Sequence, residues 1–279
     1  MTNINMYATL AEYKAYVTAR GQTASTDTTD DGVINSLIES ASRFIDMQTR
    51  RQFYPSIETR LYDVPEFREI VLDNDLLALT TLTNGDTTVI SASDFTLRGA
   101  RPPYWSIAPK DSSSVYWTYS TAGSAEQVIS VLGVWGYHEQ YTQRAWLQVG
   151  TLSAAITDTT TLAFSATAGH TITAGQILKI DSELYNVVTA ATNTITPYVR
   201  GDNGSTAATH LINAPVYAWQ PMEGAKQSCI EIANSSYQKR FGRNTGESAT
   251  ITAAGVVLTP ADIPATAKAF IASHVRHVL

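Results

Sequence analysis

Histidines are the residues of this chain best suited to acid–base or metal chemistry. There are five of them: His138, His170, His210, His274 and His277. Only His274 and His277 share a helical neighbourhood, at a spacing compatible with a metal ion. No carboxylate or cysteine stands near them in the sequence, so we expect no metal site there.

Other reactive side chains fit structural roles better. Asp73 and Asp75 flank Asn74, which is typical of a solvated turn rather than an acid–base pair. The tripeptide from Arg200 to Asp202 matches a cell-adhesion motif, but the following Asn and Gly favour a plain turn. Cys229, the one cysteine, lies on an apolar helical face and is expected to be a buried filler rather than a reactive thiol.

No motif with a specific catalytic or phosphate-binding spacing occurs. The sequence lacks a phosphate-binding glycine loop, a dinucleotide fingerprint, a serine elbow and a zinc-protease helix. We therefore expect no catalysis, no cofactor and no metal. An enzyme whose site is assembled from distant residues is the alternative that the sequence leaves open.

Composition bounds the class of protein. The chain has 279 residues, of which 44% are hydrophobic and 16% charged, as in a globular protein of one or two domains. Its formal net charge of -6 disfavours broad binding to nucleic acid, which depends on Lys and Arg. No apolar run has the length of a membrane span and no signal peptide is evident, so we expect synthesis in the cytoplasm and no membrane partner.

The strongest periodic pattern runs from Asp30 to Pro55 and predicts a helix of roughly 20 residues. Asp30 and Asp31 stand where the helix dipole favours anions, and Arg50 and Arg51 where it favours cations. The apolar stripe consists of Ile34, Leu37, Ile38, Ala41, Phe44 and Ile45.

Three further helices are predicted. A capping box from Thr9 to Glu12 begins a short helix that Gly21 is placed to end. A second begins after Pro221 and ends near Lys239, Arg240 and Arg243, and a third begins at Pro264.

Between these helices the pattern changes to strands. From Ile57 to about Gln143, short β-forming runs alternate with turns, and tyrosines and tryptophans concentrate there. The expected strands are 60–64, 69–72, 79–82, 88–90, 95–97, 115–119 and 127–135, with a rigid turn at 101–105.

A second all-β region extends from Leu147 to Trp219. It is rich in Thr, Ala, Ile and Val, carries a net charge of -2 (two basic and four acidic residues) and has no helical periodicity. We expect an inserted sandwich or barrel (147–219) within a helical connector domain that also has a sheet region (1–146 and 220–279), which makes an α+β chain. A short Gly-Ser linker in place of 147–219 is expected to leave a folded protein.

The order of these elements resembles a known family. The segments TLAEYKAYV (Thr9 to Val17), IESASRFIDMQTRRQFYP (Ile38 to Pro55) and ETRLYDVP (Glu58 to Pro65) resemble the head-to-tail connector, or adaptor, proteins of tailed bacteriophages. The likeness covers Thr9 to about Tyr141 and, more loosely, Pro221 to Phe241. Residues 147–219 depart from the shorter members, but DSELYNV and YVRGDNGSTAATH look like β modules of other virion proteins.

The resemblance implies a structural virion protein at the head–tail junction. Its expected partners are further copies of itself in a ring of about twelve, the portal protein, a tail or nozzle protein, and passing DNA in transient contact. Candidate ring-interface residues are Glu39, Arg43, Asp46 and Arg50. Candidate portal-contact residues are Phe270, Ile271, His274, Arg276, His277, Val278 and Leu279, with packing on the protein's own core as the alternative.

Two further expectations stay open at this point. Lys239, Arg240 and Arg243 could face DNA, or could simply complement the dipole of their own helix. A host-surface or glycan-binding module in 147–219 is the alternative function, and it predicts clustered exposed aromatic residues there, for which Tyr185, Tyr198 and Tyr217 are the candidates.

Overall fold

The computed structural model describes residues 4–20, 28–241, 251–252, 255–256 and 263–276. The chain divides into two compact units. The first combines the residues up to Arg50 with those from Trp146 onward, and the second consists chiefly of Arg51–Ala145. We expect residues 147–219 to be an insertion that can be removed without unfolding the rest of the chain, and this separability stays a prediction.

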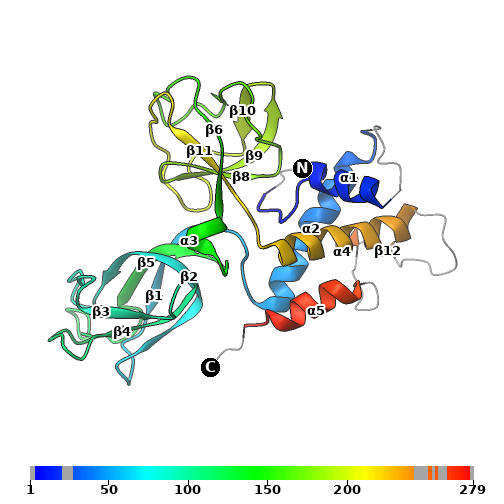
Figure 1. The fold of residues 1–279 in the computed structure, drawn as a ribbon. Helices are drawn as coiled ribbons and strands as arrows, with labels where there is room; N and C mark the ends of the chain where they lie inside the picture. The colour runs from blue at the N-terminus through cyan, green and yellow to red at the C-terminus, as the bar shows by residue number, and fades with distance from the viewer. Residues whose placement is uncertain (1–3, 21–27, 242–250, 253–254, 257–262, 277–279) are drawn as a thin grey trace. The chain divides into compact units, whose positions relative to one another are not determined.

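The expectation of an α+β chain built on a helical connector domain is wrong. In the described part of the chain, two antiparallel sheets of five and six strands dominate, and five short helices make up 25% of the residues (Figure 1). Helical periodicity gives a strong signal but here it occupies few residues. The strands expected at 69–72 and 79–82 are parts of one longer strand, Ile70–Thr83.

Four helices of the first unit pack together as a helical cluster: α1 (Leu10–Ala19), α2 (Asp31–Thr49), α4 (Glu223–Phe241) and α5 (Ala265–Ser273). The capping box of α1 is confirmed, because Thr9 accepts from the Glu12 amide and Glu12 accepts from the Thr9 amide. Helix α2 buries most of its predicted stripe: Ile38, Ala41 and Ile45 are fully buried, and Phe44 is half-buried. It ends at Arg50, whose backbone is left-handed (φ 54). Gly21, proposed to end α1, lies outside the described residues.

The second half of the cluster is built on α4. Cys229 is fully buried as predicted, with its sulfur 3.3 Å from Ser42 Oγ of α2, and burial raises the pKa of its thiol to about 12. Helix α5 lies beside α4 (Figure 1) and buries Ala267 completely. Beyond α5, the Arg276 amide donates to the Thr49 carbonyl at 2.8 Å.

The second unit contains the five-stranded sheet, in the order β1-β5-β2-β4-β3. Its strands are β1 (Ser56–Tyr62), β2 (Ile70–Thr83), β3 (Phe95–Arg98), β4 (Tyr104–Pro109) and β5 (Ile129–Trp135), followed by the short α3 (Tyr141–Arg144). The first half of β2 pairs with β4 and the second half with β5, so this one strand links both sides of the sheet. Its core contains the fully buried Leu76, Ile107, Ile129, Val131 and Trp135.

Several strand expectations in this unit are wrong. The segment from Asp73 to Asp75 reads as a turn, but it belongs to β2, where Arg51 pairs with Asp75 at 2.7 Å. The turn predicted at 101–105 is shorter than expected: it contains a cis Pro102-Pro103 bond, and β4 begins directly afterwards at Tyr104. Residues 115–119 form no strand: Trp117 is held instead by its indole N–H, which donates to the Arg68 carbonyl at 2.8 Å.

Residues Trp146–Trp219 form the six-stranded sheet of the first unit, in the order β6-β11-β8-β9-β10-β7, which we call the β module. Its strands are β6 (Trp146–Thr151), β7 (Phe164–Ser165), β8 (Ile177–Ile180), β9 (Glu183–Ala191), β10 (Thr194–Pro197) and β11 (Pro215–Trp219). The module has its own apolar core, which includes Leu152, Leu178, Tyr185 and Val216. The remaining described strands, β12 (Ile251–Thr252) and β13 (Gly255–Val256), pair only with each other. No helix among the described residues is long and apolar enough to cross a membrane.

The contact between α4 and α5 depends on Gly224. A Cβ at this position would come within 2.6 Å of the Phe270 ring, which is closer than packed atoms can approach. We expect Gly224→Ala to displace α5 and to lower the stability of the first unit, although alanine favours helices.

Gly32→Ala is the matched control, since no atom lies within 4 Å of its Cβ position in the first turn of α2. It should stabilise by up to about 1 kcal/mol. Urea melts and hydrogen exchange of residues 265–273 measure both effects. Equal stabilisation by the two substitutions would contradict the packing of Phe270 on Gly224.

Candidate interaction surfaces

The ring-interface candidates on α2 divide into engaged and exposed residues. Arg43 pairs with Asp46 at 3.1 Å and donates to the Asn5 carbonyl at 2.8 Å, while Asp46 also accepts from the Tyr7 hydroxyl. Glu39 is half-buried and Arg50 is exposed. Arg43 and Asp46 therefore hold the N-terminal segment of their own chain, and their role in a ring contact stays a prediction.

Asp46 has an unusual electrostatic environment. Burial raises the pKa of its carboxyl to about 6, although Arg43 and the hydrogen bond from Tyr7 act in the opposite direction. The charged carboxylate is therefore tolerated at neutral pH at a cost in stability.

The portal-contact candidates pack largely within the helical cluster. The Phe270 ring stacks on His274 with centroids 4.1 Å apart and contacts Gly224, as described above. Ile271 and Arg276 are half-buried. His277, Val278 and Leu279 lie outside the described residues. The structure thus supports packing on the protein's own core for this segment, and contact with a portal stays a prediction.

The DNA-facing candidates lie at the end of α4. Lys239 and Arg240 are both exposed in its last turn, where cations complement the helix dipole. Arg243 lies outside the described residues.

The β module contains a buried ionic cluster that sequence reasoning missed. The side chains of Arg200 and Glu183 are 4% and 0% exposed. They form a bidentate pair, in which Arg200 Nε donates to Glu183 Oε1 at 2.8 Å and Arg200 Nη2 donates to Glu183 Oε2 at 3.0 Å. The same carboxylate accepts from the Gly201 and Ala208 amides, each at 2.8 Å, and lies 2.9 Å from His210 Nε2. Arg200 is thus inaccessible to an adhesion receptor, and the turn interpretation of this tripeptide is right.

This cluster fixes three loops of the module. Arg200 Nη1 also donates to the carbonyls of Asp158 and Thr161, each at 3.0 Å. Burial acts to raise the pKa of Glu183, but hydrogen bonds from Arg200, the two amides and His210 outweigh it and lower the pKa to about 2. A signal existed in the sequence, because charges are rare in this module and most of its few charged residues belong to this network.

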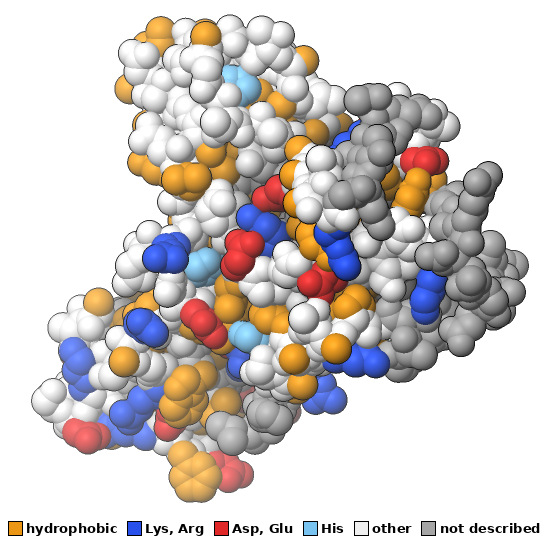
Figure 2. All heavy atoms as spheres, turned by 45° about the vertical axis from the view of Figure 1, so that its right-hand side comes forward, with side chains coloured by type: hydrophobic (Ala, Val, Ile, Leu, Met, Phe, Trp, Pro, Cys, Tyr) orange, Lys and Arg blue, Asp and Glu red, His pale blue; other side chains and the backbone are white. Residues whose placement is uncertain are grey.

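Aromatic residues of the module do not gather on its surface. Tyr185 is fully buried, Tyr198 is 42% exposed, and the half-buried Tyr217 packs under the Lys179 ammonium, 5.5 Å from the ring centroid. Figure 2 shows that the visible face of the module, at the top of the view, is mainly white and orange, with hardly any charged side chain.

The described residues include no group of three or more His, Cys, Asp or Glu side chains placed to hold a metal ion. The described histidines have structural partners: the Gln140 amide donates to His138 Nδ1, His170 Nε2 lies 2.6 Å from the Thr192 carbonyl, and His210 Nδ1 lies 2.7 Å from Asp181.

The chain matches no protein family, no curated protein and no solved structure.

The first prediction from these surfaces concerns Asp46. Because its pKa rises from 3.8 unfolded to about 6 folded, the folded state binds more protons, and stability should fall as pH rises between these values. The total loss is up to about 3 kcal/mol. Asp46→Asn, which still accepts from Tyr7, should remove this slope in urea melts at pH 4 to 7. Glu39→Gln on the same helix is the control and should keep the slope of stability with pH. If Asp46→Asn also kept this slope, the assignment of the slope to Asp46 would be wrong.

The second prediction concerns Glu183. Its pKa is lowered from 4.5 to about 2, so the stability it contributes is present above pH 4.5 and is lost as pH falls toward 2. Glu183→Gln should destabilise by about 3 kcal/mol at pH 7 because it leaves Arg200 buried without its counter-charge. Asp181→Asn, which alters a carboxylate that is 61% exposed beside the same His210, should cost under about 1 kcal/mol. Equal losses for the two variants would contradict the importance of burial.

Proposed function

We propose that this protein is a structural component of a tailed-bacteriophage virion, a ring-forming adaptor between the portal of the DNA-filled head and the tail. The observation that carries the proposal is the placement of the segments that resemble adaptors. Thr9 to Val17 supplies the N-cap and most of α1, Ile38 to Pro55 supplies most of α2 and the buried Phe53, and Glu58 to Pro65 supplies most of β1. Each segment of the resemblance therefore forms a regular element, in the order helix, helix, strand.

Charge supports a channel role. The net charge of -6 would let DNA slide through a ring, because a strongly basic lumen would bind its phosphates. Positive residues such as Lys239 and Arg240 at one helix end would provide weak and transient contacts.

The surface of α2 supplies a candidate contact between copies. Met47 of α2 is 66% exposed, and the exposed Arg50 follows one turn later. In contrast to Arg43 and Asp46, neither is needed to hold the N-terminal segment. We assign the ring contact of α2 to Met47 and Arg50.

Recognition of a host glycan through the β module has less support. That function needs aromatic rings presented together to the sugar, and Tyr185 is committed to the core while Tyr217 is covered by Lys179.

Electron microscopy of the purified protein tests the proposal. We expect class averages of closed rings for the natural chain, and a shift to single subunits for Met47→Gln/Arg50→Gly. These substitutions suit their sites, because Gln is a good helix former and Gly accepts the left-handed backbone of residue 50. Ala15→Gln, at an exposed position on α1, is the control and should leave rings intact. Absence of rings in the natural chain would contradict the adaptor proposal, while rings in the double variant would contradict only the α2 contact.

A further inference from the structure

The N-terminal segment, residues 4–9, is buried although it forms neither helix nor strand. Asn5, Met6, Tyr7, Ala8 and Thr9 are between 1% and 7% exposed. A segment without regular structure is buried in this way only when other parts of the protein hold it.

On one side the segment is held by α2. The Tyr7 amide donates to Ser42 Oγ at 3.1 Å, and the Tyr7 hydroxyl donates to Asp46. The Arg43 guanidinium donates to the Asn5 carbonyl and lies 5.7 Å from the centroid of the Tyr7 ring. The segment is therefore fixed to the helical cluster through both backbone and side-chain groups.

On the other side Asn5 is held by two asparagines of the β module. The Asn5 backbone amide donates to Asn186 Oδ1 at 2.8 Å, and Asn186 Nδ2 donates back to the side-chain oxygen of Asn5, Oδ1, at 3.1 Å. Asn203 exchanges a further pair of side-chain hydrogen bonds with Asn5, at 2.8 and 2.9 Å. We call these three residues the asparagine clasp. The backbone N–H, the backbone carbonyl and both polar atoms of the Asn5 side chain are all hydrogen-bonded. Buried polar groups of α2 and of the β module therefore depend on Asn5 for their partners.

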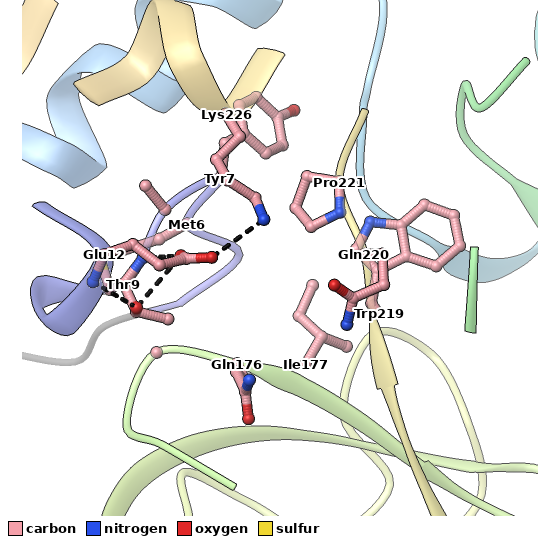
Figure 3. Close-up of a pocket in the computed structure, with 12 residues that line it drawn as sticks. Met6, Tyr7, Thr9, Glu12, Gln176, Ile177, Trp219, Gln220, Pro221 and Lys226 are labelled. Carbon is pink, nitrogen blue, oxygen red and sulfur yellow. Dashed lines mark hydrogen bonds and ion pairs between the residues drawn. The ribbon is translucent and has the colours of Figure 1, made fainter. Parts of the chain in front are cut away.

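Met6 extends the contact with the module. Its Cε occupies the space beside Gly175, where a Cβ would come within 2.7 Å of it. Figure 3 shows Met6, Tyr7 and Thr9 of the segment facing Gln176, Ile177 and Trp219 of the module across a small pocket. At the same place Glu12 of α1 pairs with Lys226 of α4 at 2.9 Å.

Among the residues that the structure describes, few other connections join the β module to the helical cluster. Only residues 220–222 separate the end of β11 from the start of α4. Within the described chain, no strand of the module packs extensively on a helix, whereas helices pack on helices and strands on strands. The buried segment thus supplies a substantial non-covalent link between two parts that each have a core.

We propose that residues 4–9 are a strap that locks the β module onto the helical cluster, and that displacement of the strap frees the module while both parts stay folded. The strap gives the protein a releasable joint. Its module end is the asparagine clasp, and its helix end is the contact of Tyr7 with Ser42 and Asp46.

Loss of the clasp in the full-length chain tests this proposal. Asn5 and Asn203 both have left-handed backbones (φ 53 and 49), so glycine fits both positions without backbone strain. Asn5→Gly/Asn203→Gly removes the three hydrogen bonds made by the Asn5 and Asn203 side chains and leaves the bond from the residue 5 backbone amide to Asn186 Oδ1. Spin labels at the exposed Thr189→Cys of β9 and Lys268→Cys of α5 report the distance between module and cluster, since Cys229 is buried. We expect one narrow distance distribution in the natural background and at least a twofold broader one in the clasp variant.

Asn213→Gly is the matched control, because Asn213 is an exposed asparagine of the same module with the same left-handed backbone (φ 67). It should leave the distribution unchanged. Hydrogen exchange should quicken at least tenfold around residues 5, 186 and 203 in the clasp variant, while the cores of the module and of α2 stay protected. An unchanged distribution in the folded clasp variant would overturn the proposal. If the double variant unfolds, Asn203→Gly alone decides: a folded chain with a broadened distribution supports the strap, whereas an unchanged distribution or loss of both cores overturns it.

Discussion

The first unit depends on the burial of α2 from more than one side. Its apolar stripe packs against α4, where Ile38, Ala41 and Ile45 are fully buried. Complete burial of one isoleucine side chain contributes about 1.5–3 kcal/mol, so this stripe is a large part of the unit's stability. The polar residues beside the stripe bind the N-terminal segment, so a second surface of the same helix is also covered.

Satisfied polar groups determine how the β module attaches to this helical cluster. An amide buried without a partner costs about 1–3 kcal/mol, and this penalty excludes arrangements that would leave Asn5, Asn186 or Asn203 unpaired. Within the module, the ion pair of Glu183 and Arg200 has the same effect on its loops. Apolar burial provides the driving force in both places, and the polar networks select one arrangement.

Local patterns predicted the helices better than the sheets. The capping box at Thr9, the stripe of α2, the buried Cys229 and the start of α5 after Pro264 all depend on residues near in sequence, and all are confirmed. Strand β2 was divided in two because polar residues within a strand look like a turn; there, Asp75 is balanced by Arg51, far away in the sequence. The same limitation hid the asparagine clasp, because Asn186 and Asn203 are separated from Asn5 by 181 and 198 positions in the sequence.

The candidate site residues show a similar division. Periodicity placed Arg43 and Asp46 on the polar side of α2 correctly, but it could not show that their own N-terminal segment covers them. Phe270 was a candidate for contact with a portal, and Gly224 of α4 provides a partner within the chain. A single sequence shows which faces need covering, but not what covers them.

We propose that this chain works through assembly, as a ring of identical subunits. Native mass spectrometry of the purified protein tests this proposal most directly, because it counts the subunits in each particle. We expect one dominant closed species of many copies that persists on dilution. A population of monomers, or an open-ended ladder of sizes that grows with concentration, would contradict it.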